Sequence, residues 1–323
     1  MSVIEETVIA EIRAGAGRRL AAIDPLLPET VNLPRGCGVI FAADGSDHQA
    51  AVASCEYWEG GPESIGRTWG ASRRFRLIPA IAGPDVAAAL DALIQQWSEH
   101  LADAHDTDGE DTAAGIAWPS RDAEGIRVLL RHGMAPRSVV AARATRSDRV
   151  EHVTAGAEPA GIVIRRAGPA DIDAVASLGI GLVRYDKYFG SVIERPETEE
   201  LLRRDSADLL AASEPWTWLA ERDGAAVGML TGLRPEASTW LAATTRLAPV
   251  AYLQDGFVIG AERGSGIGAM LTAAFHTELA KAGAAVALLH YSQVNPLSAP
   301  FWSQQGYRPL WTTWEARPAR TLR

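Results

Sequence analysis

The feature that most constrains this chain is a glycine-rich turn between an apolar run and a helix-like run. The apolar run is Tyr252–Ile259, the turn reads ERGSGIGA, and an alanine- and leucine-rich segment continues to Gly283. Gly264 and Gly266 let the backbone adopt positive φ and leave its N–H groups uncovered. At the positive end of a following helix, such N–H groups predict a phosphate or pyrophosphate site. The alternative is a tight connection that binds nothing, although glycine this dense lowers stability unless a ligand compensates.

The charge balance limits the partners of the chain. The net charge is −9 and the pI is near 5.3, which argues against a nucleic-acid surface. An anionic cofactor must therefore be held locally. No run approaches the roughly 18 apolar residues of a membrane span, and the N-terminal residues are acidic where a signal peptide needs positive charge. We expect a soluble, cytoplasmic protein, a monomer or homodimer, with small-molecule partners, no nucleic-acid partner and no membrane partner.

Metal chemistry finds little support in the sequence. The two cysteines, Cys37 and Cys55, do not form a CxxC pair, and we expect both to be ordinary buried thiols. An acidic loop places Asp106 and Asp108 in partial register with a calcium loop, but it lacks the first and twelfth ligands. We therefore predict no metal site.

The 323 residues allow about two domains, and an internal repeat supports that number. The matching positions, each 173 residues apart, are Asp122 with Asn295, Gly133 with Gly306, and Pro136 with Pro309. Each triplet lies in the same predicted order of strand, short helix, Gly and strand. In the first copy the turn reads IAGPDVAA, with one glycine, no Arg and a proline that removes an N–H donor. Only the second copy is expected to hold a phosphate.

The second copy resembles the GNAT family of acyl-CoA-dependent N-acetyltransferases. The resemblance rests on the Arg-Gly-x-Gly-x-Gly turn, the strand and Asn after it, and an aromatic-rich helix ending in Gly-Tyr. The specific match runs from Leu253 to Gly306, and the order of elements agrees from Ile162 to Arg317. The degenerate first copy makes the chain similar to the tandem members of the family.

This resemblance implies an α+β fold of two tandem GNAT-like domains, each a mixed, mostly antiparallel sheet flanked by helices. Residues 1–150 would form the degenerate domain and residues 158–323 the catalytic domain, with a linker at 144–160. The implied function is the transfer of an acetyl group from acetyl-CoA (coenzyme A) to a primary amine of a small molecule. The identity of the amine stays open.

The resemblance also assigns a coenzyme A site residue by residue. Arg263, with the backbone of the turn, would cradle the pyrophosphate. Backbone groups near Phe257, Val258 and Ile259 would line the pantetheine path, and one N–H would polarise the thioester carbonyl. The turn residues are Gly264, Ser265, Gly266, Ile267, Gly268 and Ala269, and the residues expected on the pantetheine side are Asn295, Ser298, Phe301 and Trp302. An N-cap role for Asn295 is the alternative.

Transfer needs a base for the amine and a proton for the departing thiolate. Asp255, in the strand beside the reaction zone, is the first candidate base, and a structural role is its alternative. His290 and Glu262 are weaker candidates. The family's usual Tyr, seven residues after the Asn, is replaced by Trp302, whose indole cannot release its proton as a phenol does. The proton must then come from Tyr291, Tyr307, His290 or water, unless the thiolate leaves unassisted.

The amine acceptor of GNAT enzymes lies between the first two helices and the central strands. That region offers Tyr185, Asp186, Tyr188, Trp216 and Trp218. Asp186 could bind an ammonium group and the rings could form a pocket wall. The alternative is that these aromatic residues belong to the core. The insertion at 236–249 is a candidate lid.

Two other functions fit parts of the sequence. GSGIGA also fits a dinucleotide fingerprint, but the position of the ribose-binding acid holds His290 and Tyr291 instead. The other is a binding or self-protection module that holds a small molecule or coenzyme A without transfer. The missing Tyr and the eroded first copy allow this second reading.

Overall fold

The computed structural model describes residues 6–34, 40–45, 49–103, 107, 109–145 and 160–323. The α-helices are α1 (Glu6–Ile23), α2 (Val86–Ala102), α3 (Ala123–Arg131), α4 (Ile172–Asp186), α5 (Thr198–Leu210), α6 (Ile267–Lys281) and α7 (Ser298–Gln304). The strands of the first half are β1 (Ile40–Gly45), β2 (Gln49–Glu59), β3 (Arg73–Ile81), β4 (Thr112–Pro119) and β5 (Ala135–Ala144). Those of the second half are β6 (Ile162–Arg166), β7 (Thr217–Arg222), β8 (Ala225–Leu233), β9 (Val250–Val258), β10 (Val286–Ser292) and β11 (Arg308–Ala316).

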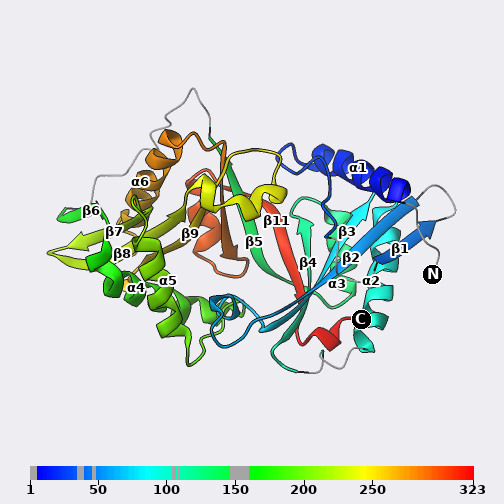
Figure 1. Cartoon of the computed structure of the whole chain (residues 1–323), viewed down its shortest axis with the longest axis horizontal. Helices are drawn as coiled ribbons and strands as arrows, with labels where there is room; N and C mark the ends of the chain where they lie inside the picture. Colours follow the sequence, from blue (N-terminus) through cyan, green and yellow to red (C-terminus); the bar gives the residue numbers. More distant parts are fainter. Residues whose placement is uncertain (1–5, 35–39, 46–48, 104–106, 108, 146–159) are drawn as a thin grey trace.

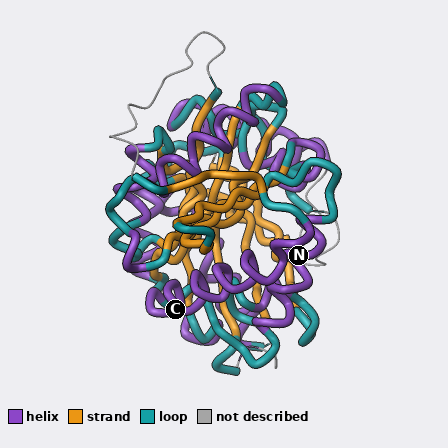
Figure 2. Tube along the Cα trace, turned by 90° about the vertical axis from the view of Figure 1, so that its left-hand side faces the viewer, coloured by secondary structure: helices purple, strands orange, loops and turns teal. Residues whose placement is uncertain are grey.

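All of these strands belong to one continuous mixed sheet. Within the described residues it has 11 strands in the order β1-β2-β3-β4-β11-β5-β10-β9-β8-β7-β6 (Figure 1). This corrects the expectation of two separate sheets. Pairing is parallel at β3/β4 and β9/β10 and antiparallel elsewhere. Helices cover both faces of the sheet, with the strands at the centre (Figure 2).

The two halves exchange their last strands. β11, from the second half, pairs with β4 of the first, whereas β5, from the first half, pairs with β10 of the second. β5 and β11 also pair with each other at the centre of the sheet. The strand order is therefore symmetric about the β11/β5 boundary, and the one parallel pair of each half occupies the same place on either side.

The two faces of the second half have separate cores. On one face α6 packs on a cluster that includes Leu253, Leu289 and Tyr291. On the other face α4 and α5 cover Met229 and Leu219. Because side chains alternate along a strand, neighbours in β10 point to opposite faces.

The first half supports the connection between α4 and α5. The loop after β2 reaches this connection, where Ile193 N donates to Thr68 O over 2.9 Å. Arg195, whose side chain is 10% exposed, binds both carboxylate oxygens of Asp111 at 2.8 Å. A charge pair joined by two hydrogen bonds fixes the relative orientation of the segments that carry it. The position of α4 and α5 therefore depends on the first half.

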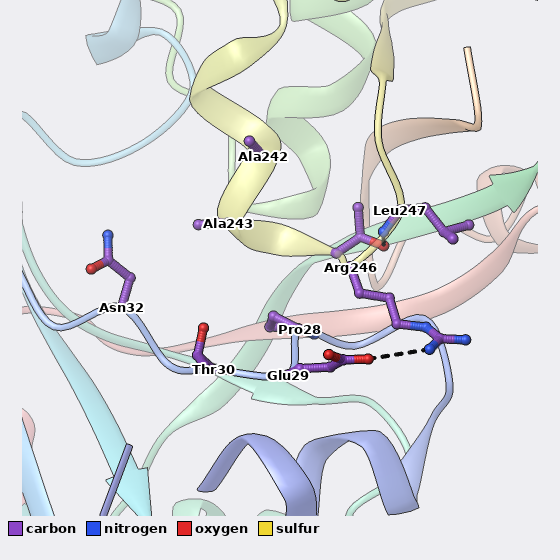
Figure 3. A pocket seen from close by; sticks show the side chains of 9 residues that line it. Pro28, Glu29, Thr30, Asn32, Ala242, Ala243, Arg246 and Leu247 are labelled. Carbon is purple, nitrogen blue, oxygen red and sulfur yellow. Dashed lines mark hydrogen bonds and ion pairs between the residues drawn. The ribbon is translucent and has the colours of Figure 1, made fainter. Parts of the chain in front are cut away.

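The insertion at 236–249 contains the short 3₁₀ helices η5 (Pro235–Ala237) and η6 (Thr239–Thr244). It packs against the segment after α1, where Leu26 O accepts hydrogen bonds from Thr245 Oγ1 (2.7 Å) and Arg246 N (3.1 Å). Arg246 also pairs with Glu29 at 3.3 Å, beside an open cavity of about 590 Å³ (Figure 3). The segment expected as a lid is therefore anchored to the first half.

Several sequence predictions fall outside the described residues, namely the linker around 146–159, Cys37, and Asp106 and Asp108 of the acidic loop. Cys55 is buried as predicted and accepts a hydrogen bond from Trp97 Nε1 at 3.3 Å. No helix in the described part of the chain combines the length and apolar composition that a membrane span requires.

Candidate active site

The strands β9 and β10 pair at their starts and then separate. Their parallel register runs from Val250 opposite Val286 to Leu253 opposite Leu289, and both strands continue beyond it. At this point β9 has one extra residue, because Thr231 of β8 faces Asp255 whereas Gly232 faces Leu253. The extra residue, Gln254, forms a bulge, which bends a strand away from its neighbour. The end of β9 therefore has backbone groups without a strand partner on the side of β10.

The hydrogen-bond pattern identifies these groups. Ile259 N donates to Val227 O over 3.0 Å, so its backbone faces β8. Residues of an antiparallel strand alternate in the direction of their N–H and C=O groups. Gly256 and Val258 therefore direct theirs toward β10, and Val258 O accepts a hydrogen bond from Arg263 Nε at 2.9 Å. Of the three residues expected along the pantetheine path, Val258 has its N–H available.

The glycine-rich turn has the conformation that its sequence predicts. Gly264 and Gly266 have φ of +78° and +95°, and a Cβ added at either would meet no atom within 4 Å. Gly266 is the N-cap of α6, so the N–H groups of Ile267, Gly268 and Ala269 have no acceptor within the helix. Ser265 Oγ turns back and donates to Glu262 O at 2.6 Å. The space beside the α-carbons of Gly264 and Gly266 is thus open.

Gly268 has a packing role that the sequence did not indicate. A Cβ at this position would lie 3.1 Å from the ring of Phe301 on α7. Glycine therefore allows α6 and α7 to approach each other. Ser298 begins α7 and is half-buried.

Arg263 turns inward over the separated strands. Its guanidinium carbon lies 4.1 Å from the ring centre of Tyr185 and 5.4 Å from that of Phe257. Cation–π contact and the bond to Val258 O fix this orientation. Glu262, the weaker candidate base, pairs with Arg222 through two contacts of 2.8 Å and so anchors the turn to β7.

Asp255 lies at the bulge, within a group of acidic and polar side chains. Thr231 Oγ1 donates to its carboxylate at 3.3 Å and accepts from its backbone N–H at 3.1 Å. Gln254 Nε2 donates to Asp205 of α5 at 3.1 Å. Burial, and next the charge of Asp205, raise the pKa of Asp255 to about 7. A carboxyl group with this pKa can accept a proton at neutral pH.

Sequence reasoning missed Asp205, Gln254 and Thr231 as parts of this group. No motif marks them, because they come together only through the bulge in β9 and the packing of α5. The structure thus adds a second carboxylate beside the predicted base.

His290 and Tyr291 point to opposite faces of the sheet. Tyr291 is buried in the α6 core, whereas His290 reaches solvent on the other face and bonds Tyr252 Oη through Nδ1 at 3.0 Å. Its ring is exposed yet packed among protein atoms that lower its pKa through desolvation, which favours the neutral imidazole. The three predicted catalytic side chains therefore do not converge on one point.

Trp302 lies where β9 and β10 separate. A Cβ at Gly256 would be 3.6 Å from its indole, so the ring rests against the strand. Tyr307, another proton-donor candidate, is 3% exposed, and its hydroxyl is 3.1 Å from His276 Nε2. This interaction keeps Tyr307 away from the separated strands. Neither residue is placed as a solvent-connected acid.

Asn295 connects the region expected to bind coenzyme A with the region expected to bind the amine. Its Nδ2 donates to Asp186 Oδ1 at 3.1 Å, and its Oδ1 accepts from Leu297 N at 3.0 Å. Leu297, not Asn295, is the N-cap of α7, which corrects the N-cap alternative. Burial raises the pKa of Asp186 to about 6, although the Asn295 hydrogen bond and the charge of Arg263 oppose this rise.

The remaining predicted acceptor residues separate into two kinds. Tyr188 is 80% exposed. Trp216 and Trp218 are buried on the α6 face, with ring centres 5.6 Å and 6.2 Å from that of Phe275. The structure therefore corrects the prediction for both tryptophans, because they pack in the core on the opposite face from Asp186.

The comparisons with known proteins concern the fold. No family model and no curated protein matches the sequence. Among solved structures, a GCN5-related N-acetyltransferase from Sphaerobacter thermophilus matches with a TM-score of 0.61 and 16% identity. The match covers 97% of this chain and 92% of that one. The chain has the GNAT N-acetyltransferase fold.

Two weaker matches accompany this GNAT fold assignment. A tandem GNAT protein from the clavulanic acid biosynthesis pathway has a TM-score of 0.49 and 13% identity, covering 97% of this chain and 94% of that one. The aminoglycoside N-acetyltransferase AAC(6')-Iy in complex with CoA has a TM-score of 0.37 and 18% identity. That match covers 46% of this chain and 89% of the other.

Proposed function

We propose that the chain is an acyl-CoA-dependent N-acetyltransferase that acts on a primary amine of a small molecule, with one active site in the second half. The observation that carries this proposal is the separation of β9 from β10 after Leu253 and Leu289, next to the open turn at Gly264 and Gly266. Backbone groups of β9 that have no partner in β10 thus lie next to N–H groups of α6 that have no acceptor within the helix.

The residues present fit coenzyme A. A pyrophosphate needs several N–H donors and free space, which the start of α6 and the open positions at Gly264 and Gly266 provide. The N–H of Val258 would polarise the acyl carbonyl, since it faces the space beside β10. When bound, acetyl-CoA would supply an activated acetyl thioester.

The chain's own residues would manage the protons and orient the amine. Asp186 would hold the ammonium form of the acceptor near the separated strands. Asp255 would take the proton from the amine, directly or through water, before the nitrogen bonds to the acyl carbon. When the carbon–sulfur bond breaks, the nitrogen would lose its second proton, and the departing thiolate would take up a proton through water. Trp302 provides packing there and no proton.

We further propose that the halves are copies of one unit and that the first has lost its site. Its region corresponding to the turn begins α2 after Asp85, whose carboxylate caps Ala88 N at 2.9 Å. Asp122, the counterpart of Asn295, is paired with Arg19 of α1. In the first half, the groups at the positions that correspond to the proposed site are therefore bound by side chains of the protein itself.

Thermal unfolding with acetyl-CoA, followed by release of free thiol across a panel of amines, tests the proposal. We expect stabilisation by acetyl-CoA and amine-dependent thiol release. Stabilisation without release would favour a module that binds coenzyme A, which the replacement of the usual Tyr by Trp302 supports. Absence of stabilisation would overturn both functions.

A further inference from the structure

Five arginines gather where the first half meets the connection between α4 and α5. Three belong to the first half, one directly follows β11, and the fifth belongs to the connection itself. They are Arg67, Arg74, Arg137, Arg317 and Arg195, and we call them the arginine cluster.

Contacts at two glycines show that the cluster is continuous. Arg317 Nη1 donates to Gly190 O at 3.3 Å, and Arg137 Nη1 lies 3.0 Å from where a Cβ of Gly190 would be. A Cβ at Gly70 would lie 3.4 Å from Arg317 Nη2 and 3.6 Å from Arg74 Cζ. Gly70 O also accepts from Arg195 Nη2 at 3.3 Å. Arg74, Arg137, Arg195 and Arg317 are thus neighbours, and Arg67 joins them through its carbonyl oxygen, which accepts a hydrogen bond from Arg195 Nη1.

The positive charge of the cluster exceeds the negative charge that pairs with it. Asp111 pairs with Arg195 at 2.8 Å and Glu315 with Arg317 at 2.9 Å. Among the described residues, Arg74 donates to two carbonyl oxygens, Gly66 O at 2.6 Å and Ala71 O at 3.0 Å, and lies over the ring of Trp58. Burial lowers the pKa of Arg74, which shows that its charge is poorly solvated.

Arg67 and Arg137 lack even carbonyl acceptors. Both are half-buried, both have an Nε enclosed by protein, and neither side chain makes a hydrogen bond or ion pair to any described residue. Buried guanidinium groups are usually paired, because an uncompensated charge is costly. The two side chains therefore have donors that a ligand anion would satisfy.

The cluster borders the candidate active site. Arg137 O accepts from Gln293 N at 2.9 Å, directly after β10. Ser191, next to Gly190, donates through Oγ to Ser292 Oγ at 3.1 Å. The same chain segment connects to Asp186 at the end of α4. The site thus has carboxylates on one side and guanidinium groups on the other.

We propose that the arginine cluster binds a carboxylate or a similar anionic group of the acceptor. The substrate would then be an amine that also carries negative charge, such as an amino acid or a compound containing one. This inference rests on the proposed transferase function. Asp186 and Asp255 would face the ammonium end, and Arg67 and Arg137 the anionic end.

The test compares ω-amino acids with alkylamines of matched length, for example γ-aminobutyrate with n-butylamine. We expect kcat/KM to be at least about tenfold higher for the best amino acid than for its alkylamine. Arg67→Gln combined with Arg137→Gln should remove this preference. Arg76→Gln is the matched control, because Arg76 is exposed and paired with Glu56 at 2.6 Å. Equal use of both amine classes by the wild type would overturn the inference.

Binding measurements separate this inference from the proposed function. Acetyl-CoA should stabilise the wild type and the double variant equally, whereas succinate should stabilise only the wild type. Stabilisation by acetyl-CoA with no effect of succinate or amino acids would overturn the inference and leave the transferase proposal intact. Succinate should compete with γ-aminobutyrate. Activation of n-butylamine acetylation by succinate would instead show a separate anion effector and contradict an anionic acceptor.

The folding of the double variant is a further readout. Removing two unpaired guanidinium charges should leave the melting temperature without ligand unchanged or higher. A lower melting temperature without ligand would show that the cluster stabilises the fold, contrary to the proposed role.

Discussion

Asn295 donates a hydrogen bond from Nδ2 to Asp186 Oδ1 across 3.1 Å, and this bond connects the loop before α7 to the end of α4. The two residues are 109 positions apart in the chain. One belongs to the side where coenzyme A is expected and the other to the side of the amine. Their bond therefore fixes the distance between the two proposed regions.

Asn295→Ala should weaken binding of the amine. The hydrogen bond from Asn295 opposes the raised pKa of Asp186, so its loss should move that pKa further above about 6. At neutral pH fewer Asp186 side chains would be ionised, and KM for the amine should rise about tenfold. Steady-state kinetics at several pH values measure this effect. Gln293→Ala, at an exposed neighbour, serves as control, and an unchanged KM would contradict the role of Asp186.

Transfer should depend on the ionisation of Asp255. The pKa of about 7 predicts that kcat/KM rises with pH through this value and then levels off. Asp255→Asn should lower kcat/KM by a factor of about one hundred or more and remove the dependence. A pH profile of both proteins provides the test. An unchanged profile in the variant would assign the base to another group.

Ionisation of the Asp255 carboxyl group, which should increase the transfer rate, should decrease the stability of the fold. Its pKa in the folded chain lies above the ordinary value of 3.8, so the protonated form favours folding. This contribution is fully present below about pH 4 and disappears as the pH rises through about 7. At about pH 8, Asp255→Asn should therefore raise the free energy of unfolding by about 1–3 kcal/mol. Denaturant unfolding on both sides of neutrality measures it, and a loss of stability at alkaline pH would show that ionised Asp255 is a structural partner.

Gly266→Val should abolish stabilisation by acetyl-CoA. Its positive φ disfavours a branched side chain, and its open surroundings would place that side chain where the pyrophosphate is expected. Gly224→Val is a matched control, because Gly224 has φ of +79° and open space at the β7–β8 turn. Both should lose about 1–2 kcal/mol of stability. Equal acetyl-CoA shifts in the two variants would place the cofactor elsewhere.

Trp302→Tyr should increase transfer if protonation of the thiolate limits the rate. A phenol at this position can donate a proton where indole cannot, and we expect kcat to rise about tenfold. The smaller ring leaves space beside Gly256, which should cost about 1–2 kcal/mol of stability. Trp302→Phe is the control, because it leaves similar space beside Gly256 but has no hydroxyl proton to donate. Equal kcat in the two variants would show that the thiolate departs unassisted.

Tyr307→Phe tests whether the Tyr307 hydroxyl, on the α6 face of the sheet, stabilises the fold or donates a proton in the reaction. It removes the bond to His276, so we expect stability to fall by about 1 kcal/mol with kcat unchanged. Rate and unfolding measured on one preparation decide this. A large fall in kcat would make Tyr307 a proton donor.

Local rules predicted the turn but not the contacts around it. Gly264 and Gly266 were predictable because only glycine readily adopts their φ. Asn295 and Asp186 were both selected, but their bond depends on how α4 packs and cannot be derived from either residue alone. The tryptophans at 216 and 218 were misassigned because their strand residues fit either face equally well. The bulge at Gln254 has no sequence signature, so its effects on Asp255 and Asp205 were not foreseen.

The exchange of the last strands limits how the protein can be made. β4 is synthesised early, but its neighbour β11 is the last strand of the described chain to be made. A nascent first half must therefore leave the ribosome with an open β edge, which is a site for aggregation. Neither half can complete its sheet alone. The first half consequently cannot be discarded, because the sheet of the second half needs β5, the last strand of the first half.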